Sequence, residues 1–213
     1  MTSSFKAHVL KFAVLGALVA APLPAMAQSL VIGQAGGVTV GNQRGGAAQT
    51  TVGVNLTPYL RITGEYGHLS SILPQSVADD VNAQANTYAT QFGNTATTSG
   101  TLRADTFSAL VRVHTDSKQT VGAYLEAGGG VAHLSGSYFA TMVDPINGNS
   151  DITSQVTEPL LTSSTQGLFS IGGGVTFAIN GRTGLDVGYR FNRISGDTPI
   201  NSGSFYTGLQ LRF

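Results

Sequence analysis

Two histidine–serine pairs are the residues whose types and spacing best fit nucleophilic catalysis. In His133-Leu134-Ser135, and again in His68-Leu69-Ser70, one residue separates the two side chains, so on a strand both point to the same side. An imidazole can take the proton of a serine hydroxyl, but a triad also needs an acid that orients the imidazole. We expect no acid of the same outward parity close to His133, because Glu126 faces the other side and Glu158 lies in a loop. Together with the duplication of the pair, this predicts a protein that is not an enzyme.

Metal and cofactor chemistry have little support in the sequence. The chain has no cysteine, which excludes disulfides, thiolate metal sites and cysteine catalysis. Beyond the first 27 residues, His68, His114 and His133 fall in separate strands without ligand spacing. We interpret the loop acids as solvated charge, with contact to divalent cations or cationic partners as the alternative; they are Asp79, Asp80, Asp144 and Asp151. We therefore predict no catalytic, cofactor or metal site.

The elements that carry these residues are strands, because apolar and polar residues alternate with a period of two. The clearest case is the end of the chain, where Phe205, Leu209 and Leu211 alternate with polar or small residues. The eight predicted strands lie near residues 30–41, 49–56, 60–69, 103–115, 120–133, 167–179, 183–193 and 205–213. An even number of antiparallel strands closes into an up-and-down barrel with both ends on the same side, so we predict an all-β fold of this kind.

Short and long connections alternate along the chain. Short turns are expected at residues 57–59, 116–118 and 180–182, and longer polar loops at 42–48, 70–102, 135–166 and 195–204. This asymmetry is typical of transmembrane barrels, which have short periplasmic turns and long extracellular loops. In the second long loop, Ser76-Val77-Ala78-Asp79 resembles a helix capping box, and Val77, Val81, Gln84, Tyr88 and Phe92 follow at helical spacing. A short helix and a mobile loop both remain open for this segment.

The first 27 residues have the pattern of a secretory signal peptide. Lys6 and Lys11 precede an apolar run at residues 12–21, and Ala25-Met26-Ala27 is a small-x-small cleavage site. We therefore expect a signal peptide at 1–27 and one barrel domain at 28–213. After cleavage, nine Lys and Arg remain against eleven Asp and Glu, and Lys118 is the single lysine among them. Without a basic stripe, nucleic acid is excluded as a partner. No later apolar stretch has the length of a membrane-spanning helix.

The polar faces of the strands indicate that the apolar faces meet lipid. Those faces are rich in Gly, Ser and Thr, and charged residues make up 10% of the chain, whereas a soluble barrel would carry many more charges outside. Seven charges share the parity of the polar faces: Arg61, Glu65, Arg112, Glu126, Asp186, Arg190 and Arg212. Because buried charges persist when they are paired, we expect an ionic network that plugs the lumen, with wet and weakly coupled cavities as the alternative.

These residues together resemble a known family, the small eight-stranded outer-membrane barrels of the OmpA/OmpX-like and opacity-type surface proteins. Gly208, Leu211 and Phe213 match the C-terminal pattern by which the barrel-assembly machinery recognises such proteins, although Tyr206 replaces a usual polar residue. The resemblance implies a monomer in the outer membrane of a Gram-negative-type bacterium, surrounded by lipids that include lipopolysaccharide. It also indicates that the peptidoglycan-binding domain of longer relatives is missing.

The resemblance implies several functions rather than one. A surface protein that acts in envelope structure or adhesion, through contacts of its loops with an extracellular ligand or host surface, fits the long loops and the plugged lumen best. A narrow porin-like channel for small solutes is the alternative. A lipid A deacylase is less favoured, because eight-stranded enzymes of that kind use a His-x-Ser pair together with an acid.

Overall fold

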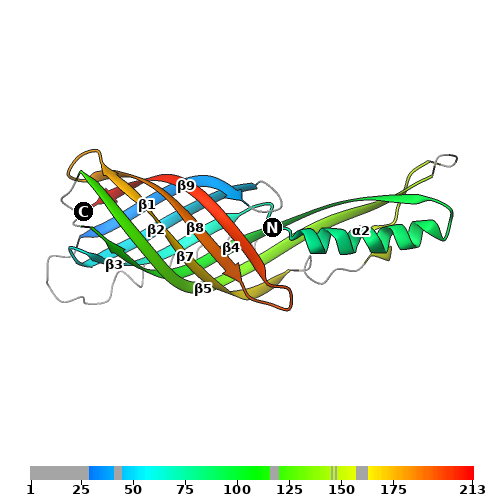
Figure 1. Ribbon diagram of the computed structural model, residues 1–213, viewed down its shortest axis with the longest axis horizontal. Coiled ribbons are helices and arrows are strands. Elements are labelled where there is room, and N and C mark those ends of the chain that lie inside the picture. The colour runs from blue at the N-terminus through cyan, green and yellow to red at the C-terminus, as the bar shows by residue number, and fades with distance from the viewer. Residues whose placement is uncertain (1–28, 41–44, 116–119, 145, 147, 157–162) are drawn as a thin grey trace, which may run out of the picture.

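Eight antiparallel strands close into a barrel in the computed structural model, which describes residues 29–40, 45–115, 120–144, 146, 148–156 and 163–213 (Figure 1). The barrel strands are β1 (Leu30–Val40), β2 (Gly45–Thr57), β3 (Leu60–Leu69), β4 (Thr95–His114), β5 (Val121–Val143), β7 (Ser164–Ala178), β8 (Thr183–Ile194) and β9 (Ile200–Arg212). Each strand pairs with its neighbours in the chain, and β9 pairs with β1 to close the ring. The predicted all-β, eight-stranded antiparallel fold is confirmed.

The barrel turns its apolar side chains outward. Ile62, Val111, Ile171 and Leu209 are among the exposed large apolar residues, whereas the polar residues of the same strands are buried. Ring closure gives every described barrel strand a hydrogen-bonding partner on both sides, which a sheet in hydrocarbon requires. Among the described residues, no helix combines the length and the apolar character that crossing a membrane would need.

Two of the three predicted short turns lie at the barrel end that we call the short-turn end. Pro58 and Tyr59 join β2 to β3 there. Between β7 and β8, the Asn180 side-chain oxygen accepts hydrogen bonds from the backbone N–H groups of Arg182 (2.9 Å) and Thr183 (2.8 Å). The backbone N–H of Phe213 donates to the Leu30 carbonyl at this same end (2.9 Å). The third predicted turn, at 116–118, and the predicted signal peptide lie outside the described residues.

At the opposite end, β4 and β5 run on beyond the barrel as a two-stranded hairpin (Figure 1). The α-helix α2 (Gln75–Thr90) lies along this hairpin, and the short strand β6 (Ser150–Asp151) and the 3-10 helix η1 (Thr153–Gln155) pack beside it. We call the described residues within 70–102 and 136–163 together the extension. The prediction of two polar loops here was wrong in part, because Thr and Ser replace most of the outward apolar residues and the period-two signal disappears although the strands continue.

The helix forms in the long loop, but its predicted capping box is wrong. Pro74 is the N-cap residue and offers no side-chain hydrogen bond, so Ser76 and Asp79 both lie inside the helix. The buried face of the helix recurs every four residues and consists of Val77, Val81, Ala85 and Ala89. Val77 and Val81 were predicted, whereas Ala85 and Ala89 take the place of the predicted Gln84, Tyr88 and Phe92.

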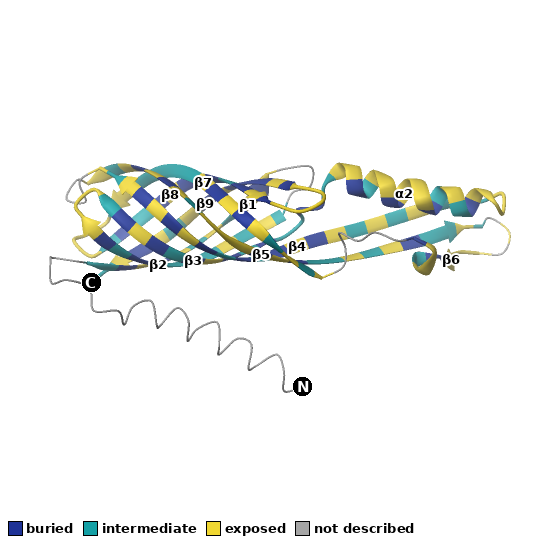
Figure 2. Cartoon of the chain, turned by 90° about the horizontal axis from the view of Figure 1, so that it is seen from below, coloured by how far each residue is buried: buried dark blue, intermediate teal, exposed yellow. Residues whose placement is uncertain are grey.

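The apolar core of the protein lies in the extension and at the barrel mouth below it (Figure 2). Val77 and Val81 of α2 belong to the same cluster as Leu102 and Leu134 of the hairpin and Ile194 of β8. Burial of such side chains stabilises by about 1.5–3 kcal/mol each. The barrel interior is therefore mainly polar, with Val31 and Leu110 as buried apolar exceptions, and apolar side chains seal the end that carries the extension.

Candidate functional site

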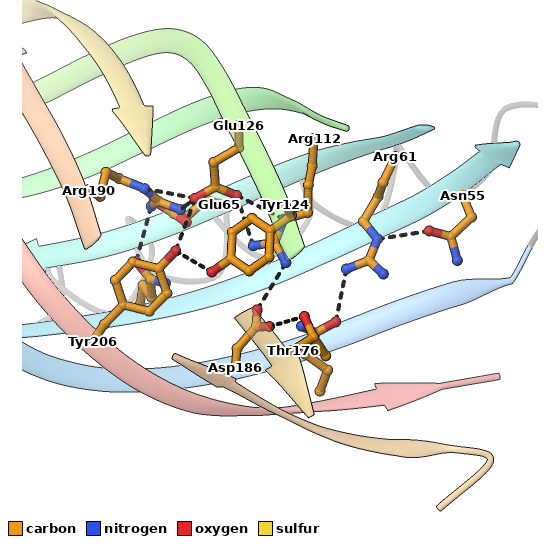
Figure 3. A network of polar contacts seen from close by, with 12 residues as sticks. Asn55, Arg61, Glu65, Arg112, Tyr124, Glu126, Thr176, Asp186, Arg190 and Tyr206 are labelled. Atoms are coloured by element: carbon orange, nitrogen blue, oxygen red, sulfur yellow. Dashed lines mark hydrogen bonds and ion pairs between the residues drawn. The ribbon is translucent and has the colours of Figure 1, made fainter. Parts of the chain in front are cut away.

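The inward-facing rows of the strands bring charged side chains into the middle of the barrel (Figure 3). Because side chains alternate along a strand, each charge is placed by parity on its own strand and by register relative to the others. Six of the seven predicted network residues are buried: Arg61 and Glu65 on β3, Arg112 on β4, Glu126 on β5, and Asp186 and Arg190 on β8. The seventh, Arg212 on β9, is half-buried and lies at the short-turn end.

Arg112 joins two carboxylates from different strands. Its Nη2 lies 2.8 Å from Glu126 Oε2, its Nε donates to the same oxygen at 2.9 Å, and its Nη1 lies 2.9 Å from Asp186 Oδ2. The guanidinium also stands 3.9 Å from the centre of the Tyr124 ring, which adds a cation–π contact. Both hydrogen bonds to Glu126 reach one carboxylate oxygen and leave the other free to serve a second partner.

Arg190 is that second partner. Its Nε donates to Glu126 Oε1 at 3.2 Å, and its two terminal nitrogens pair with Glu126 and Glu65. The Tyr206 hydroxyl donates to the same Glu126 oxygen at 3.2 Å and lies 2.8 Å from the Tyr124 hydroxyl. Glu126 therefore connects both arginines, and one continuous set of hydrogen bonds crosses the barrel from β3 to β8.

Arg61 stands apart from this set. Its Nε donates to Asn55 Oδ1 at 2.8 Å and its Nη1 donates to Gln210 Oε1 at 2.9 Å, so both acceptors are neutral amides. The structure therefore joins Glu65, Arg112, Glu126, Asp186 and Arg190 by ion pairs, whereas Arg61 and Arg212 lie nearer the short-turn end.

Sequence reasoning missed the uncharged members of the lumen. Tyr124, Tyr206 and Gln49 all bond to the network, and Thr176 bonds to Asp186. Each has the inward parity of its strand, so the alternation that placed the charges would also have found these four side chains.

The expectation of no acid beside His133 was wrong. In the register of β4 and β5, Asp105 lies directly opposite His133, and both are on the outward face. Proximity across strands depends on register, which the sequence around His133 does not reveal. His133 nevertheless bonds elsewhere, with Nδ1 3.1 Å from Thr165 Oγ1 and Nε2 3.1 Å from Ser163 Oγ.

Asp105 is engaged mainly by the neighbouring strand. Its Oδ1 lies 2.9 Å from His68 Nδ1 and accepts from the Tyr66 hydroxyl at 3.1 Å. Within the described residues, no hydrogen bond joins His133 to Ser135, the contact by which an imidazole would activate a serine.

The residues of the predicted C-terminal signal occupy both faces of β9. Leu211 and Phe213 are exposed on the outside, whereas Gly208 lies on the inward row. A side chain at Gly208 would stand 2.3 Å from the backbone oxygen of Gln34, so a glycine is needed where β9 approaches β1 this closely.

Comparison with known proteins supports the same architecture. The family described as the outer membrane protein beta-barrel domain matches residues 13–213. Neisserial surface protein A is 18% identical over 87% of this chain and 97% of that chain, with a TM-score of 0.50. A major outer membrane protein from Thermus thermophilus is 15% identical over 88% of this chain and 100% of that chain, with a TM-score of 0.51. No match was found among the curated proteins.

At these identities the solved structures establish the fold alone, whereas the family match covers most of the chain. The outward apolar rows, the closed ring and the asymmetry between short turns and the extension agree with that family. The chain belongs to the outer membrane protein beta-barrel domain family and is a protein of the Gram-negative outer membrane.

Proposed function

We propose that this protein is a monomeric surface protein whose plugged barrel anchors the extension, and that the extension binds a partner in adhesion. The observation that carries this proposal is the position of the apolar core. The cluster of Val77, Val81, Leu102 and Leu134 lies in and directly beneath the extension. A loop that only connected two strands would need no such core, whereas a surface that must hold its shape for binding does.

The extension is further fixed by hydrogen bonds around η1. The Thr153 hydroxyl accepts from the backbone N–H of Ala140 at 3.0 Å, and Ile152 N–H donates to the Ala140 carbonyl at 2.9 Å. The Tyr138 hydroxyl donates to the carbonyl of Thr153 at 3.3 Å. These contacts hold the returning segment against β5, so the extension presents its outer surface in one arrangement.

The surface chemistry of the extension favours a basic partner. Residues 70–102 and 136–163 contain no Lys or Arg and five acids: Asp79, Asp80, Asp144, Asp151 and Glu158. At the far end, the apolar side chains of Phe92 and Ile146 are 58% and 90% exposed. Charge of one sign steers a partner of the other sign, and exposed apolar side chains supply the contact area.

The binding role is tested with a variant in which two short Gly-Ser turns replace residues 71–101 and 137–163. We expect this variant to insert normally but to lose attachment to surfaces coated with basic proteins. Asp79→Asn with Asp80→Asn should weaken attachment and its salt sensitivity, whereas Asn82→Ala on the exposed face of the same helix is the matched control. Unchanged attachment of the shortened barrel at equal surface amounts would contradict the proposal, and leakage of the envelope without an attachment defect would indicate a role in envelope structure.

A plugged lumen is the second part of the proposal, with a narrow solute channel as its alternative. The ion pairs of Arg112 and Arg190 cross the barrel, and two cavities along it measure about 20 Å³ each, close to the size of one water molecule. In planar bilayers we expect no steady conductance. A steady conductance that rises when Glu65, Arg112 and Glu126 are neutralised would support the channel instead.

We also propose that the protein is not a lipid A deacylase. The contact of His133 with Ser163 and its register opposite Asp105 make this the enzyme activity to test. Lipid A mass spectrometry should find no acyl loss in cells that produce the protein. Acyl loss that disappears in His133→Ala, with His68→Ala as control, would overturn this part of the proposal.

The C-terminal residues are proposed to be the assembly signal. Phe213 is 70% exposed beside the outward row of β9, so its ring is not part of the packed interior and is available to a receptor. Deletion of Phe213 should reduce insertion into the outer membrane while the secreted form still reaches the periplasm. Fractionation of the envelope measures both pools, and normal insertion without Phe213 would remove this assignment.

A further inference from the structure

A small cavity at the short-turn end of the lumen is lined by positive side chains. Arg61, Arg112 and Arg212 line it, together with His114, Tyr124 and Thr176 among others, and no carboxylate of the described residues does. Its volume is about 20 Å³. A cavity of this kind differs from the rest of the lumen, where carboxylates separate the arginines.

Arg61 forms no ion pair with the described residues. Each of the three inward carboxylates, Glu65, Glu126 and Asp186, is instead bonded to Arg112 or Arg190. Arg61 is 5% exposed and donates to the neutral oxygens of Asn55 and Gln210. A buried charge is costly unless an opposite charge lies close to it, so the buried guanidinium of Arg61 calls for an anion.

Two buried nitrogens near Arg61 have capacity for a further hydrogen bond. Gln210 accepts from Arg61 through Oε1, and its side-chain nitrogen bonds to no group of the described protein although the residue is 4% exposed. His114 bonds through Nδ1 to the carbonyl of Thr115 at 2.8 Å, whereas its Nε2 is buried without a hydrogen bond to the described residues. The amide NH₂ of Gln210 is a donor that suits an anion.

We propose that this cavity binds one small inorganic anion of the halide class. A cavity of about 20 Å³ accepts a group of the size of one water molecule, so a monatomic anion fits where a phosphate or a carboxylate does not. The anion would lie between Arg61 and Arg112 and compensate the charge of Arg61, whose hydrogen-bond acceptors are neutral amides. It would also complete the plug at the end of the lumen that faces the periplasm.

The location is tested by crystals of the full-length mature protein grown or soaked in sodium bromide. Bromide scatters anomalously, so we expect an anomalous peak inside the cavity, in contact with Arg61. Absence of a peak there, with a water molecule in its place, would overturn the proposal. This measurement uses the unaltered protein and so does not depend on whether any variant folds.

The energetic effect is tested by thermal unfolding in detergent, in sodium chloride and in sodium gluconate at equal ionic strength. Because a ligand of the folded state raises the unfolding midpoint, we expect a midpoint about 2–4 °C higher in chloride. Arg61→Gln should abolish the difference between the two salts. Arg182→Gln should keep it, because Arg182 is exposed at the same end and does not line the cavity. Equal midpoints in the two salts for the unaltered protein, or a full difference in Arg61→Gln, would exclude the site.

Discussion

Strands β4 and β5 pass through two regions that arrange polar and apolar side chains in opposite ways. In the barrel part of β4, Val111 points outward and Arg112 points inward. In the extension, the same outward row carries Thr97 and Thr101, and the inward row carries the buried Leu102. The alternation of inward and outward side chains continues along β4 and β5 without a register shift, so the reversal comes only from a change of residue type.

The reversal occurs at one level across three neighbouring strands. On the outward face, Tyr66, Phe107 and Val131 are cross-strand partners in one row of the register. The next outward row holds His68, Asp105 and His133, which are polar. The inward rows change in the opposite sense, from Glu65 to Leu69 on β3 and from Glu126 to Leu134 on β5.

The comparison shows what the residue pattern reports. Below the boundary the outside is hydrocarbon, so apolar side chains face out and polar groups must find partners within the lumen. Above it the outside is water, and the ordinary rule of an apolar interior returns. We therefore predict that the boundary between these rows lies at the outer surface of the membrane on this side of the barrel.

The largest expected effect concerns the barrel interior. Glu126→Gln removes the carboxylate that joins Arg112 to Arg190 and leaves buried positive charge without compensation. Loss of one partner of a buried ion pair costs about 3–5 kcal/mol. Urea unfolding of the barrel in lipid vesicles measures the change, and a loss below about 1 kcal/mol would show that the lumen is wet rather than tightly paired.

An apolar truncation tests the interior of the extension in the same way. Leu102→Ala removes a fully buried side chain from the cluster beneath α2, which costs about 2–5 kcal/mol. We expect faster amide hydrogen exchange in α2 and unchanged exchange in β8 and β9. Equal acceleration in both regions would mean that the extension and the barrel unfold as one unit.

An arginine introduced on the outward row, once below and once above the boundary, tests whether hydrocarbon or water surrounds each part. Val111→Arg should destabilise the inserted protein by about 2–4 kcal/mol, because the new charge faces hydrocarbon. Thr97→Arg lies on the same row of the same strand, and its effect should stay within about 0.5 kcal/mol because it faces water. Urea unfolding in vesicles measures the free energy of unfolding of both variants. Similar losses in the two would show that the boundary does not lie between these positions.

The smallest effect is expected at the boundary itself. Asp105→Asn weakens the contact with His68. The side chains of this pair are 43% exposed for His68 and 37% exposed for Asp105. An exposed ion pair contributes about 0–1 kcal/mol, so the unfolding free energy should change far less than for Glu126→Gln. A loss as large as that of Glu126→Gln would show that this row is shielded from water.

Much of the barrel could be predicted from sequence because strand alternation is a local signal. The eight strands, and the side of each strand on which Arg61 or Asp186 lies, follow from parity within about ten residues. The extension could not be predicted in this way. Its strands carry Thr and Ser outward and small residues such as Ala96 and Gly100 inward, so polarity no longer alternates although the backbone does.

The sequence by itself determined that this chain forms strands with one apolar and one polar face, and that lipid lies against the apolar face. Only the tertiary structure decided which side chains meet. Glu126 lies between two arginines, and Asp105 lies opposite His133, because the register of each strand pair is fixed by closure of the whole ring. Register depends on residues far apart in the chain, and no local pattern contains it.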